Sequence, residues 1–440
     1  MPSLAARDTK CIWHPFTQMQ TAPPPLPIVA GEGAYLITED GRRLLDGVSS
    51  WWVNVHGHCN PHISQRVARQ AERLEHVMFA GCTHPPAVEL SERLLAKLPS
   101  SLTRVFFSDN GSTAVEVALK MAYQYWANRG EPERRTFVAL KHAYHGDTVG
   151  AMSASHDSLF TAPFKPLLFR VERLGVPRDY LSSMDPARDG TASERLAEFE
   201  NLLAERGSEI AAVIVEPMVQ AAGGMLVWKA EMLRQLRRLC DRHGLLLIAD
   251  EVMTGFGRTG KMFACEHGPV EPDLICLSKG LTGGYLPLAV TVTSDRVYDA
   301  FLGEGHSRTF FHGHSFTANP LGCAAALAGL DLFDTQRVLA RVREIEARMR
   351  ARLTRLVGRR FTHDARQIGG LAILELQTER GGYLADIAPR MGRAFLDRNL
   401  LLRPYGNIVY FMPPYVVTDR EIDWVFDQIE QVAEEVTGLG

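Results

Sequence analysis

The sequence lacks several features that mark whole classes of protein. Its seven cysteines are an odd number without a Cys-x-x-Cys pair, so we expect reduced thiols of the cytoplasm rather than a disulfide framework. No apolar run is long enough to span a bilayer, and the N-terminal residues have no signal-like apolar core. A net charge of -3 gives no basic field for nucleic acid or acidic membranes. We therefore expect a cytoplasmic globular protein.

Apolar strand patterns and amphipathic helix patterns alternate through the middle of the chain. Short apolar runs of this kind are typical of strands that are buried on both faces. They lie at 105–107, 137–140, 211–216, 245–249 and 274–277. Their alternation with helical segments predicts βαβ units and a mainly parallel α/β sheet.

Composition divides the chain into three predicted parts. Residues 1–60 form a proline-rich arm in which helices cannot propagate easily, with a hairpin whose strands lie at 33–38 and 43–46. Residues 61–330 carry the alternating strands and helices and form a large domain. Residues 331–440 combine a long charged helix, further strands and a final amphipathic helix, which predicts a smaller α+β domain that the arm joins.

Two central strands end in side chains of opposite charge, Asp250 and Lys279. Ligands of open α/β sheets bind at the carboxyl ends of the strands, so we expect both side chains to face one crevice. Alone, Asp250 would be a turn cap and Lys279 a solvated cation. Gly280, Gly283 and Gly284 follow the lysine and leave room for a ring near the backbone. An acid for a ring nitrogen and an amine for an aldehyde are what pyridoxal phosphate (PLP) chemistry requires.

Two more segments fit a phosphorylated aromatic cofactor. Gly111, Ser112 and Thr113 open a long amphipathic helix. Such residues are common helix caps, but the first amides and hydroxyls of a helix also bind phosphate. Tyr144 follows a strand and offers an aromatic face to a cofactor ring.

The sequence resembles the class III aminotransferases of PLP fold type I over nearly its whole length. The resemblance is carried, in order, by Tyr144-His145-Gly146, Glu216-Pro217, Asp250-Glu251-Val252, Gly255-Phe256-Gly257-Arg258-Thr259-Gly260 and Ser278-Lys279-Gly280. It implies a fold type I PLP-dependent transferase, with a mainly parallel seven-stranded sheet in a large domain and a smaller α+β domain.

The resemblance also implies how PLP is held. Lys279 would bind the cofactor's aldehyde and act as the catalytic base, and Asp250 would form an ion pair with the pyridinium nitrogen. Gly111 and Ser112 would bind the phosphate, and Tyr144 would stack on the ring and touch the donor.

Within the class, a narrower resemblance concerns the substrates. It is carried by Trp13-His14-Pro15, Ser49-Ser50-Trp51-Trp52, Phe263-Ala264-Cys265-Glu266-His267 and Met412-Pro413-Pro414-Tyr415. These segments are similar to the branch that converts 8-amino-7-oxononanoate to 7,8-diaminononanoate in biotin biosynthesis. There Trp51 and Trp52 would line the substrate cleft, and Arg403 would bind the carboxylate of the oxo acid, for which its bidentate geometry is suited.

The amino donor and the oligomer follow from the same resemblance. S-adenosylmethionine is the implied donor, but Phe16 stands where users of this donor commonly have a substrate-binding Tyr. Lysine as donor, or another class III ω-amino acid activity, therefore stays open. Gly313, His314 and Ser315 match the segment that a partner subunit lends to the phosphate and substrate sites, with His-Ser where Pro-Thr is common. A homodimer with shared active sites is thus implied.

Two other hypotheses arise from single motifs. Gly255 to Gly260 matches a dinucleotide fingerprint and would suggest an NAD-dependent dehydrogenase, but the segment that follows is too short and broken for the required helix. His56, His58, Cys59 and His62 would suggest a metal site, but their spacing matches no helical ligand pair. We expect no metal there.

Overall fold

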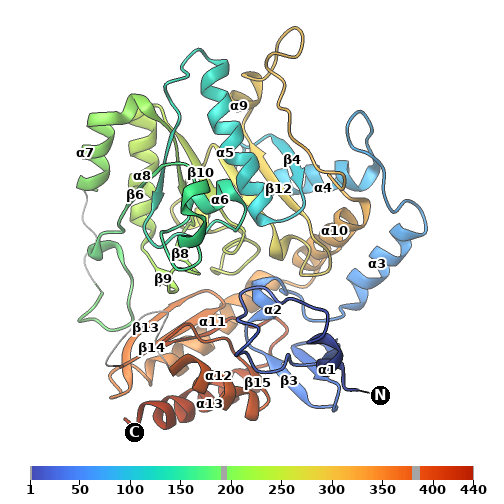
Figure 1. The fold of residues 1–440 in the computed structure, drawn as a ribbon, viewed down its shortest axis with the longest axis vertical. Helices are drawn as coiled ribbons and strands as arrows, with labels where there is room; N and C mark the ends of the chain where they lie inside the picture. The colour runs from blue at the N-terminus through green and yellow to red at the C-terminus, as the bar shows by residue number, and fades with distance from the viewer. Residues whose placement is uncertain (1, 190–195, 379–386, 440) are drawn as a thin grey trace.

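The computed structural model describes residues 2–189, 196–378 and 387–439 (Figure 1). A seven-stranded sheet forms the centre of the larger part, with strand order β4-β12-β11-β10-β7-β5-β6. Only β12 is antiparallel to its neighbours in this sheet. The strands are β4 (Arg104–Ser108), β5 (Thr136–Leu140), β6 (Val171–Leu174), β7 (Ile210–Val215), β10 (Leu246–Asp250), β11 (Leu274–Leu277) and β12 (Ala289–Thr293). The predicted mainly parallel α/β fold is confirmed.

Helices cover both faces of this sheet, which explains its continuous apolar strands. In β10, Leu246 and Ile248 pack in the core that includes α5 (Gly111–Asn128), whereas Leu247 packs in the core that includes α8 (Ala230–His243). Alternate residues of one strand therefore face opposite helical layers. The remaining helices of the larger part are α3 (Pro61–Ala71), α4 (Pro85–Leu95), α6 (Val149–Ala154), α7 (Ala197–Arg206), α9 (Asp295–Asp299) and α10 (Pro320–Thr335).

Short elements lie between these strands and helices. Two small strands form an antiparallel pair of their own, and short 3-10 helices connect several of the larger elements. They are β8 (Val219–Gln220), β9 (Leu226–Val227), η1 (Ala162–Leu167), η2 (Arg178–Tyr180), η3 (Gly207–Glu209), η4 (Ala264–His267) and η5 (Lys279–Leu281).

The C-terminal residues form a three-stranded antiparallel sheet, ordered β13-β14-β16, with helices packed on it (Figure 1). Its elements are β13 (Thr362–Ile368), β14 (Leu371–Leu376), β16 (Ile408–Phe411), α11 (Val338–Thr354), α12 (Ile387–Asp397) and α13 (Asp419–Thr437). Ion pairs join α11 to α13 along their exposed sides: Arg341–Asp419, Arg348–Asp423 and Arg352–Asp427.

The N-terminal arm joins this C-terminal part through a second sheet, ordered β1-β2-β3-β15. The predicted hairpin is present as β2 (Tyr35–Thr38) and β3 (Arg43–Asp46), and β3 pairs in parallel with β15 (Leu400–Leu401). The arm is more regular than its prolines suggested. It also contains α1 (Leu4–Asp8), capped by the Ser3 hydroxyl, and β1 (Ile28–Glu32), an edge strand on β2. The boundaries at 60 and 330 stay a prediction, and α10 continues past the second of them to Thr335.

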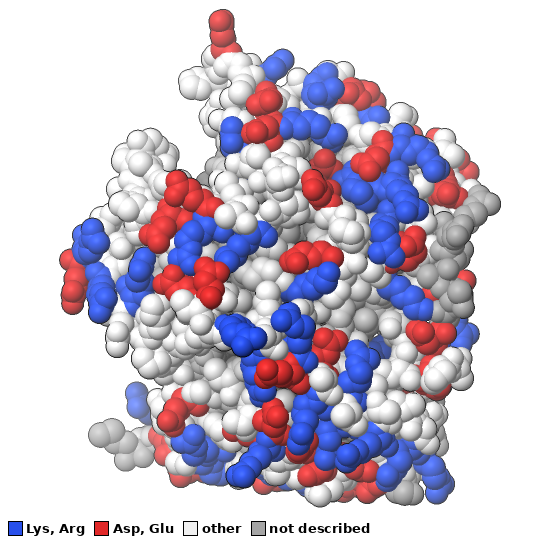
Figure 2. All heavy atoms as spheres, turned by 180° about the vertical axis from the view of Figure 1, so that it is seen from behind, with Lys and Arg blue, Asp and Glu red and all other residues white. Residues whose placement is uncertain are grey.

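Charged side chains of both signs are mixed over the visible surface (Figure 2), as the small net charge of -3 suggests. Figure 2 shows Lys and Arg side chains interspersed with Asp and Glu, densest toward the lower end of the molecule. In the part of the chain that the structure describes, no helix combines the length and the apolarity needed to cross a membrane.

Candidate active site

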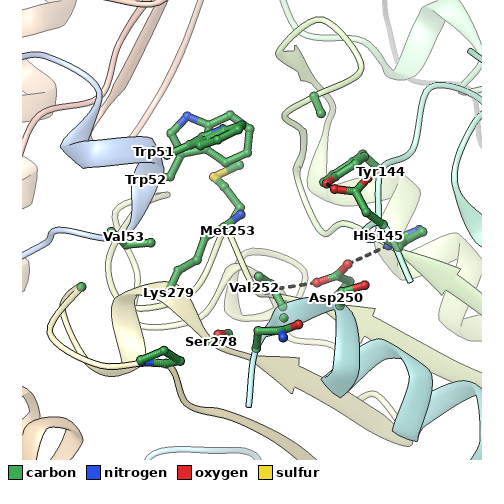
Figure 3. Close-up of a pocket in the computed structure, with 18 of the residues that line it drawn as sticks. Trp51, Trp52, Val53, Tyr144, His145, Asp250, Val252, Met253, Ser278 and Lys279 are labelled. Carbon is green, nitrogen blue, oxygen red and sulfur yellow. Dashed lines mark hydrogen bonds and ion pairs between the residues drawn. The ribbon is translucent and has the colours of Figure 1, made fainter. Parts of the chain in front are cut away.

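A cavity of about 850 Å³ lies at the carboxyl ends of β10 and β11. Asp250 is the last residue of β10 and Lys279 follows the parallel strand β11 by two residues, and both line it. Figure 3 shows them directed into the same space from neighbouring strand ends. The predicted meeting of an acid and an amine in one crevice is therefore present.

Asp250 is buried and held in place by two donors. His145 Nδ1 lies 2.7 Å from Asp250 Oδ2, and the Val252 amide donates to Oδ1 at 3.1 Å. His145 itself is buried, and its backbone amide donates to the Ser155 hydroxyl at 2.9 Å. A carboxylate fixed through both oxygens keeps one orientation in the cavity.

Lys279 has a different environment. Its Nζ lies 4.5 Å from the centre of the Trp52 ring, and its backbone is left-handed with a φ of 47°. Removal from water lowers the pKa of Lys279 to about 8, against the opposing effect of the carboxylates of Asp250 and Glu216. A lysine with a pKa near 8 supplies a useful fraction of free amine close to neutral pH.

The N-terminus of α5 forms another wall of the cavity. Asn110 caps the helix, and its side-chain Oδ1 accepts a hydrogen bond from the Thr113 amide. The amides of Gly111 and Ser112 belong to the first turn of the helix, where no preceding carbonyl of the helix is available to them. Gly111 must lack a side chain, because a Cβ there would lie 2.5 Å from Val252 Cγ1. The Ser112 hydroxyl lies 2.7 Å from Thr148 Oγ1.

Tyr144 lies on the side of the cavity opposite the tryptophans (Figure 3). Its hydroxyl donates to Asp147 Oδ2 at 2.9 Å, and burial raises the pKa of this phenol. The adjoining Gly146 leaves space above Ser112, since a Cβ at Gly146 would lie 2.3 Å from Ser112 Oγ. Because Gly111 and Gly146 have no side chains, this end of the cavity stays open to the N-terminus of α5.

The two tryptophans stand on a left-handed turn, α2 (Ser49–Trp52), in which all four residues have φ between 46° and 74°. Each left-handed residue costs roughly 1–2 kcal/mol. Side chains hold the turn: Ser49 Oγ donates to the Met412 carbonyl at 2.7 Å, and Ser50 Oγ donates to Asp46 Oδ2 at 2.7 Å. Residues 49–52 therefore keep a strained conformation at the cavity wall.

The outer part of the cavity carries an aromatic row that ends in a guanidinium. Phe16 contacts Trp51 and Phe160 edge to face, with ring centres 5.6 and 5.7 Å apart. Arg403 Cζ lies 4.2 Å from the centre of the Trp51 ring. Phe16, Trp51 and Arg403 were all predicted from the sequence as substrate-site residues, and all line the cavity.

Gly313, His314 and Ser315 do not line this cavity within the described chain. Gly313 and Ser315 are exposed, and His314 Nδ1 lies 3.6 Å from Asp109 Oδ2 at the cavity's edge. Their predicted role, which requires a second subunit, stays a prediction.

The residues of the two rival motifs have other partners. His58 lies 2.9 Å from Asp46 Oδ2 and His62 lies 3.0 Å from Asp331 Oδ2, while His56 is buried against Phe333. Among the described residues, no group of three or more His, Cys, Asp or Glu side chains could hold a metal ion. Residues 255–260 form turns, and no helix begins at these glycines.

Sequence reasoning missed several cavity residues. Glu216 follows β7 as Asp250 ends β10, so the same pattern of a buried strand ending in a carboxylate could have identified it. His145 stood in a recognised motif but had been given no role. Asp147 and Phe160 lie on loops, where the sequence carries no periodic signal.

The cavity residues fit PLP. The α5 terminus offers two amides and a hydroxyl to a phosphate, and the Gly111 and Gly146 positions keep that space clear. Asp250 offers a buried carboxylate to a ring nitrogen, and Lys279 offers an amine to an aldehyde.

Comparisons with known proteins agree with this geometry. The family described as aminotransferase class III matches residues 16–433. A protein of Synechococcus elongatus named adenosylmethionine-8-amino-7-oxononanoate aminotransferase is 49% identical, with 97% of this chain and 99% of that protein covered. A protein of the same name from Geobacter sulfurreducens is 45% identical, with 98% and 97% covered.

Solved structures share the fold. The crystal structure of the enzyme of that name from Methanocaldococcus jannaschii has a TM-score of 0.92 and 37% identity, with 98% of each chain covered. An omega transaminase from Pseudomonas jessenii in complex with PMP has a TM-score of 0.91 and 25% identity, with 99% of each chain covered. The chain therefore belongs to the class III aminotransferases, a PLP-dependent family.

Proposed function

We propose that this enzyme transfers an amino group to 8-amino-7-oxononanoate, giving 7,8-diaminononanoate for biotin biosynthesis, with S-adenosylmethionine as the amino donor. The relatives that carry this activity in their names align with nearly the whole chain. Lysine as donor is the second candidate, because Phe16 has no phenolic hydroxyl with which to bind adenosylmethionine.

The observation that supports 8-amino-7-oxononanoate as the acceptor is the position of Arg403. Its guanidinium is exposed to the cavity, lies on the Trp51 ring, and forms no ion pair with any residue in the described ranges. An arginine of this kind is suited to a substrate carboxylate. Arg403 lies on the Trp51 ring and Lys279 on the Trp52 ring, so two adjacent indole side chains separate the two cations, which suits the methylene chain of a long oxo acid.

The protein's own groups support each part of the chemistry. PLP supplies an aldehyde that captures amines and a ring that accepts electrons from the bond that breaks. Asp250 would keep a proton on the ring nitrogen, and the amides of Gly111 and Ser112 would hold the phosphate. Lys279, with its lowered pKa, would take the proton from the donor's α-carbon and return one to the acceptor. Trp52 covers the lysine and restricts water.

The experiment that tests the donor is a half-reaction with one donor at a time. The cofactor-loaded enzyme is mixed with S-adenosylmethionine or with lysine, and its visible absorbance band is followed. We expect adenosylmethionine to remove the band and lysine to leave it. The Phe16→Tyr variant should bind adenosylmethionine roughly 2- to 10-fold more tightly, the value of one added hydrogen bond. Loss of the band with lysine alone would reverse the assignment of the donor.

Arg403→Ala should raise the KM for 8-amino-7-oxononanoate by roughly 10- to 100-fold, because a charged hydrogen bond contributes about 1.5–3 kcal/mol. The KM for the donor should change far less. Initial rates at varied concentrations of each substrate separate the two effects. Arg398→Ala is a suitable control, since Arg398 also lies close to β15, just before it in the sequence, but pairs with Glu435 and does not line the cavity. Equal effects of Arg403→Ala on both KM values would exclude a specific carboxylate site.

The homodimer is part of the same proposal. Phe311 and Phe316, on either side of Gly313, His314 and Ser315, are 73% and 59% exposed in the single chain. Large exposed aromatic side chains around a predicted shared segment suit burial by a second copy. A monomeric mass for the active enzyme in sedimentation would contradict it.

A further inference from the structure

Glu216 is a further buried acid-base group in the cavity, beside Asp250 and His145. It follows β7, the strand next to β10, so its carboxylate enters the cavity from the neighbouring strand end. The backbone amide of Tyr144 donates to Oε1 at 2.9 Å, and the amide of Ala221 donates to Oε2 at 3.2 Å. Glu216 therefore fixes the backbone from which the Tyr144 ring projects.

The charges around Glu216 couple it to the reactive amine. Burial raises the pKa of Glu216 to about 7, with His145 opposing this rise and Asp250 adding to it. Toward Lys279, the carboxylates of Glu216 and Asp250 stabilise the ammonium form, and the Arg258 guanidinium destabilises it. Glu216 and Lys279 line the same cavity, Glu216 just after β7 and Lys279 just after β11, so a change in the charge of one acts on the other within one enclosed space.

We propose that Glu216 is a positioning residue with two separable actions: its charge sets how readily Lys279 gives up a proton, and its two amide contacts place Tyr144 against the cofactor ring. The inference rests on the proposed role of Lys279 as the reactive amine. It does not depend on which donor or acceptor the enzyme uses.

Glu251 provides a matched comparison within the same sheet. It is fully buried after β10, and its carboxylate accepts the amides of Ala264 at 2.6 Å and Cys265 at 2.8 Å. Burial also raises the pKa of Glu251 to about 7. Unlike Glu216, however, Glu251 does not line the cavity. A purely structural role for both carboxylates predicts similar effects of their substitution.

The test measures Lys279 directly in the full-length chain freed of cofactor. Acetylation by acetic anhydride is followed at Lys279 across pH by peptide mass spectrometry, with the exposed Lys165 as internal reference. Glu216→Gln removes the negative charge, so the midpoint for Lys279 should fall by about one pH unit. Glu216→Asp keeps the charge with a shorter reach, so its midpoint should stay near wild type while the donor KM rises. Glu251→Gln should leave the midpoint unchanged.

An unchanged midpoint in Glu216→Gln, or equal shifts in Glu216→Gln and Glu251→Gln, would overturn the inference. Should Glu216→Gln fail to fold, Lys279→Met gives an independent measurement. Coupling between two charges is mutual, so loss of the ammonium must raise the pH at which a buried carboxyl ionises in the infrared spectrum. No change in that titration would also overturn the inference. Neither result bears on the donor, which the half-reaction tests separately.

Discussion

Lys279→Ala is expected to abolish turnover while leaving a folded protein. Loss of a general base alone lowers rates by roughly 10²- to 10⁴-fold, and Lys279 would also lose its bond to the cofactor aldehyde. Steady-state rates with saturating donor and acceptor measure the effect. PLP should still bind through the α5 terminus and Asp250, which dialysis and absorbance would detect.

Two comparisons separate chemistry from folding. Lys279→Arg keeps a positive charge but offers no free amine near neutral pH, so it should be as inactive as the alanine variant. Lys261→Ala, which removes an exposed lysine bonded to the Glu266 carbonyl, should have wild-type rates. Substantial turnover in Lys279→Arg would show that the free amine is not required.

The same lysine should also affect stability. Its pKa is lowered from 10.5 to about 8 on folding, so the unfolded chain binds this proton more tightly than the folded chain. The contribution of Lys279 therefore becomes more favourable as pH rises from about 8 toward 10.5. In the cofactor-free state, Lys279→Ala should melt no lower than wild type at neutral pH, because it removes a desolvated charge.

Asp250→Asn should slow turnover by about 10²- to 10⁴-fold, with both substrate KM values less affected. A buried charge that loses its partner costs about 3–5 kcal/mol, and each 1.4 kcal/mol of barrier is tenfold in rate. The asparagine keeps an oxygen for the Val252 amide and a polar group for His145, so the local shape is retained. Single-turnover kinetics with the donor would locate the loss in the proton-transfer half.

Asp273→Asn is the matched control for this variant. Asp273 precedes β11, pairs with Arg237 at 2.8 Å and accepts the Leu247 amide at 2.8 Å, but it does not line the cavity. It should reduce stability without changing the rate per folded site. If Asp250→Asn works at a near-normal rate, the ring nitrogen needs no carboxylate and the proposed role of Asp250 is wrong.

Sequence patterns predicted the parts of the site that strands and helix termini supply. Asp250 and Lys279 follow continuous apolar runs, and Gly111 opens an amphipathic helix, so their place at one sheet edge follows from the rules of α/β folds. The hairpin of β2 and β3 was also predicted, from alternation around a turn. These are local signals, and the physics behind them is local as well.

The remaining parts depend on contacts between distant segments. Arg403 meets Trp51 only because β15 pairs with β3, and no pattern in either segment encodes that pairing. The left-handed turn at 49–52 is held by Met412 and Asp46, so a propensity-based prediction could not find it. The shared segment around His314 depends on a second chain.

The pairing of β3 with β15 has a consequence for how the enzyme matures on the ribosome. The groups predicted to hold PLP, from Gly111 to Ser315, are all synthesised well before β15. The proposed binding site for the acceptor carboxylate requires Arg403, which follows β15 in the sequence. In a nascent chain the PLP-binding groups should therefore form first. The carboxylate site at Arg403 should form last, when β15 near the C-terminus pairs with β3 near the N-terminus.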